Sequence, residues 1–235
     1  MRALFRNKTN FIIFFVLILI TDLIIKDTLK TVPYRYFSKA LIMIALILFY
    51  YTHQKEKHKK HICYMYIAMF SFFIGDMFLI NYEKVIFYIL GVFLFIVGKL
   101  FYVFRFSNQK DFKLLGLVPF FILCFMHMLF IMHLVIENLG SFLIPVFIYL
   151  FISLMLMLFA FLRKNEANKA SFILVLSGVV LSVINDSVTV LQSFYDPSII
   201  PHYDIFVMIL YGVSQYLIIS GVIKESENKT ITSVF

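Results

Sequence analysis

The chain has 235 residues, of which 62% are hydrophobic, 19% aromatic and only 14% charged. A soluble domain averages roughly 45–50% apolar and about 25% charged residues, so this composition excludes an ordinary soluble protein and indicates a polytopic membrane protein. The formal net charge of +8 does not call for a nucleic acid partner, because lysine and arginine also accumulate in the cytoplasmic loops of membrane proteins.

Eight apolar stretches follow one another along the chain. A helix needs roughly 20 apolar residues to cross a hydrocarbon core of ~30 Å, and most of the stretches approach that length. The second is short and carries Lys39 near its start, so it is the least typical of the set. The stretches lie at about residues 9–25, 38–52, 62–80, 85–106, 114–136, 141–162, 171–194 and 203–223. The sequence therefore predicts an all-α fold, a polytopic membrane bundle of eight transmembrane helices that form a single transmembrane domain over residues 1–235.

The first stretch could be confused with a signal peptide. Its apolar run is long, no small-residue cleavage site follows it, and Lys26 and Lys30 come next in the chain. We therefore interpret it as a retained membrane helix.

Lysine and arginine are distributed unequally between the two sides of the predicted bundle. With eight helices, fifteen of these residues share the side of both termini and five lie on the other side, so the positive-inside rule predicts cytoplasmic termini. We expect an integral protein of the bacterial cell (inner) membrane. The larger group is Arg2, Arg6, Lys8, Lys55, Lys57, Lys59, Lys60, Arg105, Lys110, Lys113, Arg163, Lys164, Lys169, Lys224 and Lys229, and the smaller is Lys26, Lys30, Arg35, Lys39 and Lys84.

Two aspartates, Asp76 and Asp186, interrupt apolar stretches, and Lys99 interrupts a third. A carboxylate at membrane depth costs at least ~2.5–3.5 kcal/mol, and ionisable residues inside a membrane usually mark functional sites. At 1.5 Å per residue, Asp76 lies about 7 Å and Asp186 roughly 12 Å below the outer ends of their helices. The similar depths make the two aspartates candidate partners in one site.

Other polar residues follow these aspartates at helical spacing. From Gly178 the stripe continues through Ser182, Asp186, Thr189 and Ser193 on one helix face. Such a stripe must face the bundle interior or a water-filled cavity, which we expect to open to the non-cytoplasmic side. The further candidate residues are Tyr102, Asn185, Tyr211 and Gln215.

Several residues have simpler interpretations. His127 and His133 are six residues apart, which places them on opposite sides of a helix without a third metal ligand in register. Cys63 and Cys124 lie in apolar helices and fit a role as small core residues. Asp22, near the end of the first stretch, is interpreted as a marker of the membrane interface. We predict no metal and no cofactor.

Six short elements occur in order along the predicted helices, and together they resemble the YhhN-type integral membrane family, which includes the lysoplasmalogenases. Three positions depart from the family pattern, and at two of them Lys99 stands where the family has His and Asn185 stands where it has Ser. A third departure is Phe72, adjacent to Ser71, where the family often has Ser. The elements are Arg35 to Lys39, Gly75-Asp76, Gly91-Phe95-Lys99-Tyr102, Pro145-Tyr149, Gly178-Asn185-Asp186 and Tyr211-Gln215.

The resemblance implies hydrolysis of the vinyl ether bond of a lyso ether phospholipid. One of Asp76 and Asp186 would be the general acid, and the other would stay ionised, a division of labour that glycosidases also use. Lys39 and Arg35 lie where a lipid phosphate would sit. The expected partners are a lyso-phospholipid substrate and membrane lipid, with no nucleic acid, and the sequence carries no signal for an oligomeric state. The supporting residues would be Lys99, Tyr102, Asn185, Tyr211 and Gln215.

Two other functions are compatible with the same residues. The first is a transporter or a non-catalytic lipid-binding membrane protein that uses an intramembrane Asp/Lys network. The sequence lacks an internal repeat such as transporters often carry, which speaks against transport. The second is a family member without catalysis, in which Lys99 is locked to an aspartate in place of a working site.

Overall fold

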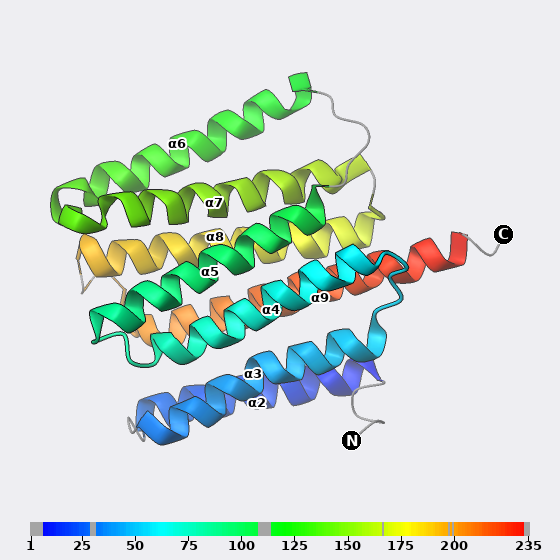
Figure 1. Ribbon diagram of the computed structural model, residues 1–235, viewed down its shortest axis with the longest axis horizontal. Coiled ribbons are helices and arrows are strands. Elements are labelled where there is room, and N and C mark those ends of the chain that lie inside the picture. The colour runs from blue at the N-terminus through cyan, green and yellow to red at the C-terminus, as the bar shows by residue number, and fades with distance from the viewer. Residues whose placement is uncertain are drawn as a thin grey trace. The chain divides into compact units, whose positions relative to one another are not determined.

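A computed structural model of the chain describes residues 7–28, 32–107, 114–165, 167–196, 198 and 200–232, and within these ranges every regular element is a helix (Figure 1). Among the basic residues used to orient the chain, Arg2, Arg6, Lys30, Lys110 and Lys113 lie outside the described residues, as does the side chain of Lys229. The α-helices are α2 (Lys8–Thr28), α3 (Val32–His53), α4 (Lys59–Leu79), α5 (Val85–Phe106), α6 (Leu114–Leu139), α7 (Leu143–Leu162), α8 (Lys169–Phe194) and α9 (Tyr203–Thr232), with 3₁₀ turns η1 (Gly140–Phe142) and η2 (Arg163–Asn165).

Seven segments of the described chain are long and apolar enough to cross a membrane. One of them, Val118–Leu162, is 45 residues long and contains most of α6, the turn η1 and all of α7. Gly140, in η1, has a φ angle of +47°, a left-handed conformation that favours glycine where one helix ends and the chain turns. These findings confirm the predicted all-helical membrane protein.

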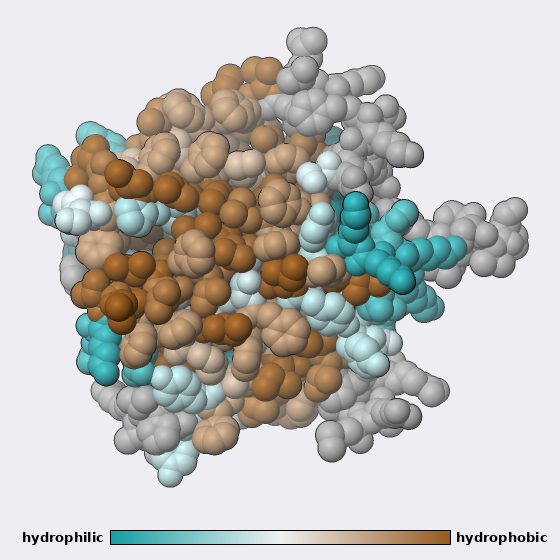
Figure 2. Space-filling model, in the orientation of Figure 1, coloured by the Kyte–Doolittle hydropathy of each residue, from teal (hydrophilic) through white to brown (hydrophobic). Residues whose placement is uncertain are grey.

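Large apolar side chains remain exposed on the outside of the helices, for example Leu41 on α3 and Phe121 on α6. Figure 2 shows apolar residues over much of the visible surface. A surface of this kind would be an aggregation hazard in water, but it is the expected surface for helices whose solvent is lipid. The exposed apolar residues therefore agree with the membrane class.

Two helices differ in extent from the apolar stretches that predicted them. The helix α3 begins at Val32, six residues before the predicted start, so Arg35 lies inside it. The helix α9 continues to Thr232, nine residues beyond the predicted end. Hydropathy detects only the apolar part of a helix, whereas Lys and Glu, which are frequent after residue 223, are good helix formers in water.

Contacts divide the chain into two compact units, residues 1–102 with 222–235 (unit 1) and residues 103–221 (unit 2), and the boundaries fall inside α5 and α9. In unit 1, α3 packs against both α2 and α4. The rings of Phe11 and Phe49 stack there with centroids 4.0 Å apart. In unit 2, the helices α6, α7 and α8 pack against one another. Their core includes Met128, Leu150 and Val183.

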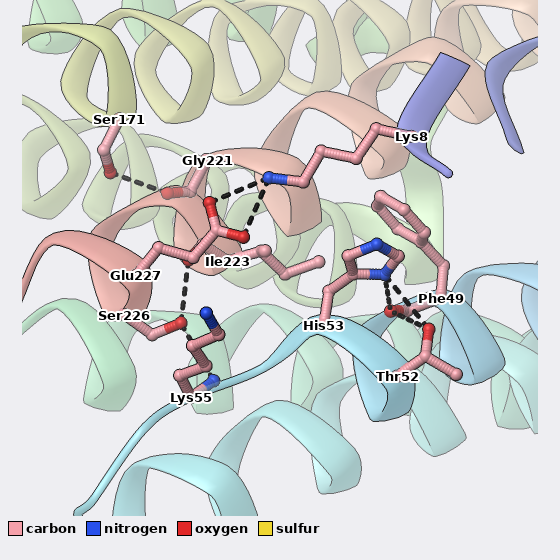
Figure 3. A network of polar contacts seen from close by, with 10 residues as sticks. All are labelled: Lys8, Phe49, Thr52, His53, Lys55, Ser171, Gly221, Ile223, Ser226 and Glu227. Carbon is pink, nitrogen blue, oxygen red and sulfur yellow. Dashed lines mark hydrogen bonds and ion pairs between the residues drawn. The ribbon is translucent and has the colours of Figure 1, made fainter. Parts of the chain in front are cut away.

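A group of polar contacts in unit 1 holds the beginning of α2 and the end of α9 (Figure 3). Lys8 Nζ lies 2.8 Å from a carboxylate oxygen of Glu227. The hydroxyl of Ser226 accepts a hydrogen bond from the backbone N–H of Lys55, just after α3, at 3.1 Å. These contacts give the polar end of α9 partners in unit 1.

Candidate functional site

The first candidate centre is the carboxylate of Asp76 on α4, in unit 1, where the residue is only 1% exposed. Lys39 on α3 places its ammonium nitrogen 3.1 Å from Asp76 Oδ1, and the two side chains are 10% and 2% exposed. A buried charge is tolerated only when it is paired or otherwise compensated. The sequence analysis placed a lipid phosphate at Lys39, and the structure gives its ammonium a carboxylate partner.

Glycines bring α4 and α5 close together next to Asp76. A Cβ atom added at Gly75 would lie 2.8 Å from the Phe95 ring and 3.2 Å from the carbonyl oxygen of Gly91. The Phe95 ring packs edge-on against Phe72, one turn before Asp76, with centroids 5.2 Å apart. The close approach fixes the rotation of α4, and it therefore also fixes the direction in which Asp76 points.

The other site residues predicted for this unit lie on α3 and α5. Lys99 and Tyr102 are both buried. The ring of Tyr102 lies 5.4 Å from that of Phe72. Burial of the Lys99 side chain means that its ammonium does not snorkel to the protein surface. Arg35, on the first turn of α3, is half-buried.

Asp22 on α2, interpreted from the sequence as a marker of the membrane interface, also has a buried hydrogen-bond partner in the structure. The structure buries it and places its Oδ1 2.5 Å from the hydroxyl of Ser38, which donates the hydrogen bond. Ser38 lies on α3, which packs against α2. The sequence carried a signal for this burial, since Thr21 and Asp22 stand together between apolar residues.

The second candidate centre is the carboxylate of Asp186 on α8, in unit 2, where the residue is 2% exposed. The phenol of Tyr149 on α7 donates a hydrogen bond of 2.5 Å to Asp186 Oδ1. At the next position of α8, the Ser187 hydroxyl lies 2.9 Å from Nε2 of His127 on α6. Two helices therefore contact α8 through polar side chains at consecutive positions.

A second face of α8 packs against the part of α9 that belongs to unit 2. A Cβ atom at Gly178 would lie 2.9 Å from the Ser214 carbonyl oxygen, and one at Gly221 would lie 2.6 Å from the Val175 side chain. Continued toward the other end of α8, this antiparallel register brings Asn185 level with Tyr211. Tyr211 and Gln215 are buried on α9.

Asn185 carries an unusual polar atom. The residue is 9% exposed, and its Oδ1 has no hydrogen-bond partner among the described residues. A buried acceptor without a partner costs about 1–3 kcal/mol, so a site of this kind favours a water or a ligand hydroxyl that can donate to it.

The structure thus assigns the predicted site residues to the two units. Unit 1 holds Arg35, Lys39, Asp76, Lys99 and Tyr102, and it brings Lys39 onto Asp76. Unit 2 holds Asn185, Asp186, Tyr211 and Gln215. Tyr149 was not among the predicted site residues, although it belongs to the Pro145-Tyr149 element of the family pattern. Within the described ranges, no three His, Cys, Asp or Glu side chains gather as they would around a metal ion.

Apolar helices of membrane-spanning length, with buried carboxylates inside them, are those of a polytopic membrane protein. The model of the YhhN family matches residues 34–222, most of the chain, and the chain therefore belongs to the YhhN family. The match includes both aspartates and every other predicted site residue, and it confirms the resemblance in the sequence. No curated protein and no solved structure matches the chain.

Proposed function

We propose that the chain is a membrane-embedded lipid hydrolase that resembles the lysoplasmalogenases and cleaves the vinyl ether bond of a lyso ether phospholipid. Acid–base catalysis by Asp76 and Asp186 would carry the reaction. Membership in the YhhN family supports this function. The observation that carries it is the presence of two buried carboxyl groups with different partners, a lysine ammonium at Asp76 and a phenol at Asp186. Different surroundings allow two carboxyl groups to take different roles.

The chemistry needs one acid and one anion. A carboxylic acid protonates the carbon of the vinyl ether, and the electron pair of the C=C bond forms the new C–H bond and leaves an oxocarbenium ion. Water attacks this cation and gives up a proton to the carboxylate left by the first step, which restores the acid, and the resulting neutral hemiacetal separates into a fatty aldehyde and a glycerophospho compound. We assign the ionised role to Asp76, because the Lys39 ammonium offsets its charge. Asp186 is then the general acid.

The remaining residues would bind water and substrate. The buried Oδ1 of Asn185 suits a water molecule or a glycerol hydroxyl, and Tyr102, Tyr211 and Gln215 would orient the same groups. Arg35 is the residue we propose for the lipid phosphate, since its guanidinium can bind two phosphate oxygens at once. In this scheme, the Lys39 ammonium compensates the negative charge of Asp76. Lys99, which stands where the family has His, would add a second buried cation in unit 1, the unit that holds Asp76.

The test is hydrolysis of a lyso vinyl-ether phospholipid by the detergent-purified protein. We expect Asp76→Asn and Asp186→Asn to lose turnover by a factor on the order of 100 or more, since general acid–base catalysis contributes that much. Asp22→Asn is the matched control, because Asp22 is a third buried aspartate and the amide oxygen can still accept from Ser38. Near-wild-type turnover of both catalytic variants would sink the proposal. Lipid binding without turnover in the wild type would favour the lipid-binding alternative.

We further propose eight membrane crossings with both termini in the cytoplasm of a bacterial cell and the site open to the non-cytoplasmic side. The segment Val118–Leu162 supports the count, because 45 residues of continuous helix would span ~68 Å against a core of ~30 Å. The left-handed Gly140 divides it into two helices. Reporter fusions at each terminus test the topology, and a periplasmic signal from either terminus contradicts it.

A further inference from the structure

The hydrogen bond between Tyr149 and Asp186 joins α7 to α8 at a part-buried position of unit 2. At 2.5 Å it lies at the short end of hydrogen bonds between oxygen atoms. Tyr149 lies in α7, whose other residues from Leu143 to Leu162 are apolar apart from Ser153. A partly buried phenol in such an apolar helix usually finds a hydrogen-bond partner, and here the partner is a carboxyl group that the proposed chemistry uses.

The backbone of α7 at Tyr149 is also held in place, by a hydrogen bond within the helix. The hydroxyl of Ser153, one turn later in α7, donates a hydrogen bond of 2.9 Å to the Tyr149 carbonyl oxygen. Ser153 is itself buried, and Leu150 belongs to the core that α7 forms with α6 and α8. A phenol carried by a packed helix can hold a carboxyl group in one rotamer, which a solvated tyrosine could not do.

We propose that Tyr149 is the positioning residue of Asp186. Its phenol holds Asp186 Oδ1, so that the proton of the acid is carried on Oδ2 and presented to the substrate carbon. Tyr149 acts through Asp186 and does not itself exchange a proton with substrate. This inference rests on the proposed function, which gives Asp186 the role of general acid.

The neighbouring contact provides a matched control. The Ser187 hydroxyl lies 2.9 Å from His127 and 2.9 Å from the Val183 carbonyl oxygen, so it also joins α8 to another helix. It does not hold the Asp186 carboxyl group. Ser187→Ala therefore removes an interhelical hydrogen bond one residue away from Asp186. If Tyr149→Phe lowers the turnover more than Ser187→Ala does, the excess is caused by the lost contact with the Asp186 carboxyl group.

The experiment compares wild type, Tyr149→Phe, Ser187→Ala and Asp186→Asn in turnover of a lyso vinyl-ether phospholipid, with each rate expressed per folded protein. We expect Tyr149→Phe to lower kcat on the order of 10–100-fold while KM stays within about twofold, since a hydrogen bond to a reacting carboxyl group is lost. Ser187→Ala should keep kcat within about threefold of wild type. Infrared difference spectra against Asp186→Asn should show the Asp186 carboxyl band shifted in Tyr149→Phe and unshifted in Ser187→Ala.

The outcomes separate the inference from the proposed function. An active wild type, an inactive Asp186→Asn and a Tyr149→Phe variant with the kcat and carboxyl band of Ser187→Ala would overturn the positioning role alone. A wild type without turnover, or an active Asp186→Asn, would overturn the proposed function, and the role of Tyr149 in catalysis would fall with it. A loss of folded protein without a loss of kcat per folded molecule would reduce Tyr149 to a structural residue.

Discussion

Asp76 and Asp186 are buried to nearly the same degree, yet the two units hold them in different ways. The carboxyl group in unit 1 lies against the Lys39 ammonium, and the one in unit 2 accepts a hydrogen bond from the neutral Tyr149 phenol. If burial alone decided how a carboxyl group behaves, Asp76 and Asp186 would behave alike. These two partners differ in charge, because the Lys39 ammonium compensates a full negative charge whereas a phenol can donate either to a carboxylate or to the carbonyl oxygen of a carboxylic acid.

The largest effect should come from removing the cation in unit 1. Lys39→Met keeps the length of the side chain but takes the ammonium away from a buried carboxylate, and breaking a buried ion pair costs about 3–5 kcal/mol. Tyr149→Phe, the corresponding change in unit 2, should cost only about 1–2 kcal/mol for one hydrogen bond. Unfolding of the purified variants in mixed micelles gives both free energies.

The double variant Lys39→Met with Asp76→Asn is the control for the first prediction. It replaces the ion pair by two neutral side chains of similar size, so most of the lost stability should return. If Lys39→Met destabilises the protein no more than Tyr149→Phe does, the difference between the two centres is not one of charge compensation.

Replacing each aspartate in turn by asparagine tests whether the two carboxyl groups have different charge environments. Asp76→Asn leaves the buried Lys39 ammonium facing an amide and should destabilise the protein by about 3 kcal/mol. Asp186→Asn keeps an acceptor oxygen for the Tyr149 phenol, so we expect it to destabilise the protein less than Asp76→Asn does. Equal losses for the two variants, measured under the same conditions, would contradict the assignment of different charge environments.

The helices and the two aspartates were predictable from the sequence for a simple physical reason. Apolar runs of membrane-spanning length and charged residues inside them are local features, and the eight stretches coincide with eight long helices in the described chain. The partners of the aspartates were not predictable. Whether Asp76 meets Lys39 or Lys99 depends on how three helices rotate about their axes, and close contacts such as that between Gly75 and Gly91 set this rotation.

Glycine contacts test how strictly that rotation is set in each unit. A methyl group at Gly75 in unit 1 would meet chiefly the Phe95 ring, which can shift. One at Gly178 in unit 2 would lie 2.9 Å from backbone atoms of Ser214 and Ile218, which cannot shift without separating α8 from α9. Gly178→Ala should therefore cost about 2–3 kcal/mol and Gly75→Ala about 1 kcal/mol. The reverse order of unfolding temperatures would show that α4 and α5 are the more rigid pair.

Asp22, the third buried aspartate, lies in unit 1 but accepts a hydrogen bond from a hydroxyl, as Asp186 does in unit 2. Removing that hydroxyl should therefore have a smaller effect than removing a charge. Ser38→Ala removes the hydroxyl that donates to Asp22, and we expect a loss of about 1–2 kcal/mol. Thr21→Ala, next to it in the chain, removes an exposed hydroxyl that only bonds the Leu17 carbonyl of its own helix, and should change stability by less than about 0.5 kcal/mol. Similar losses for both variants would mean that Asp22 does not depend on Ser38.

The smallest effect should come from the ion pair between Lys8 and Glu227. Its ions are 2.8 Å apart, closer than Lys39 and Asp76, but the side chains are 47% and 25% exposed. Water already solvates both charges, so Lys8→Ala should cost about 0.2–1 kcal/mol, and this loss should shrink further in 1 M salt. The effect of Lys39→Met should persist in the same salt, because ions do not reach a buried pair. A salt-insensitive loss for Lys8→Ala as large as that for Lys39→Met would show that separation, and not burial, sets the strength of these pairs.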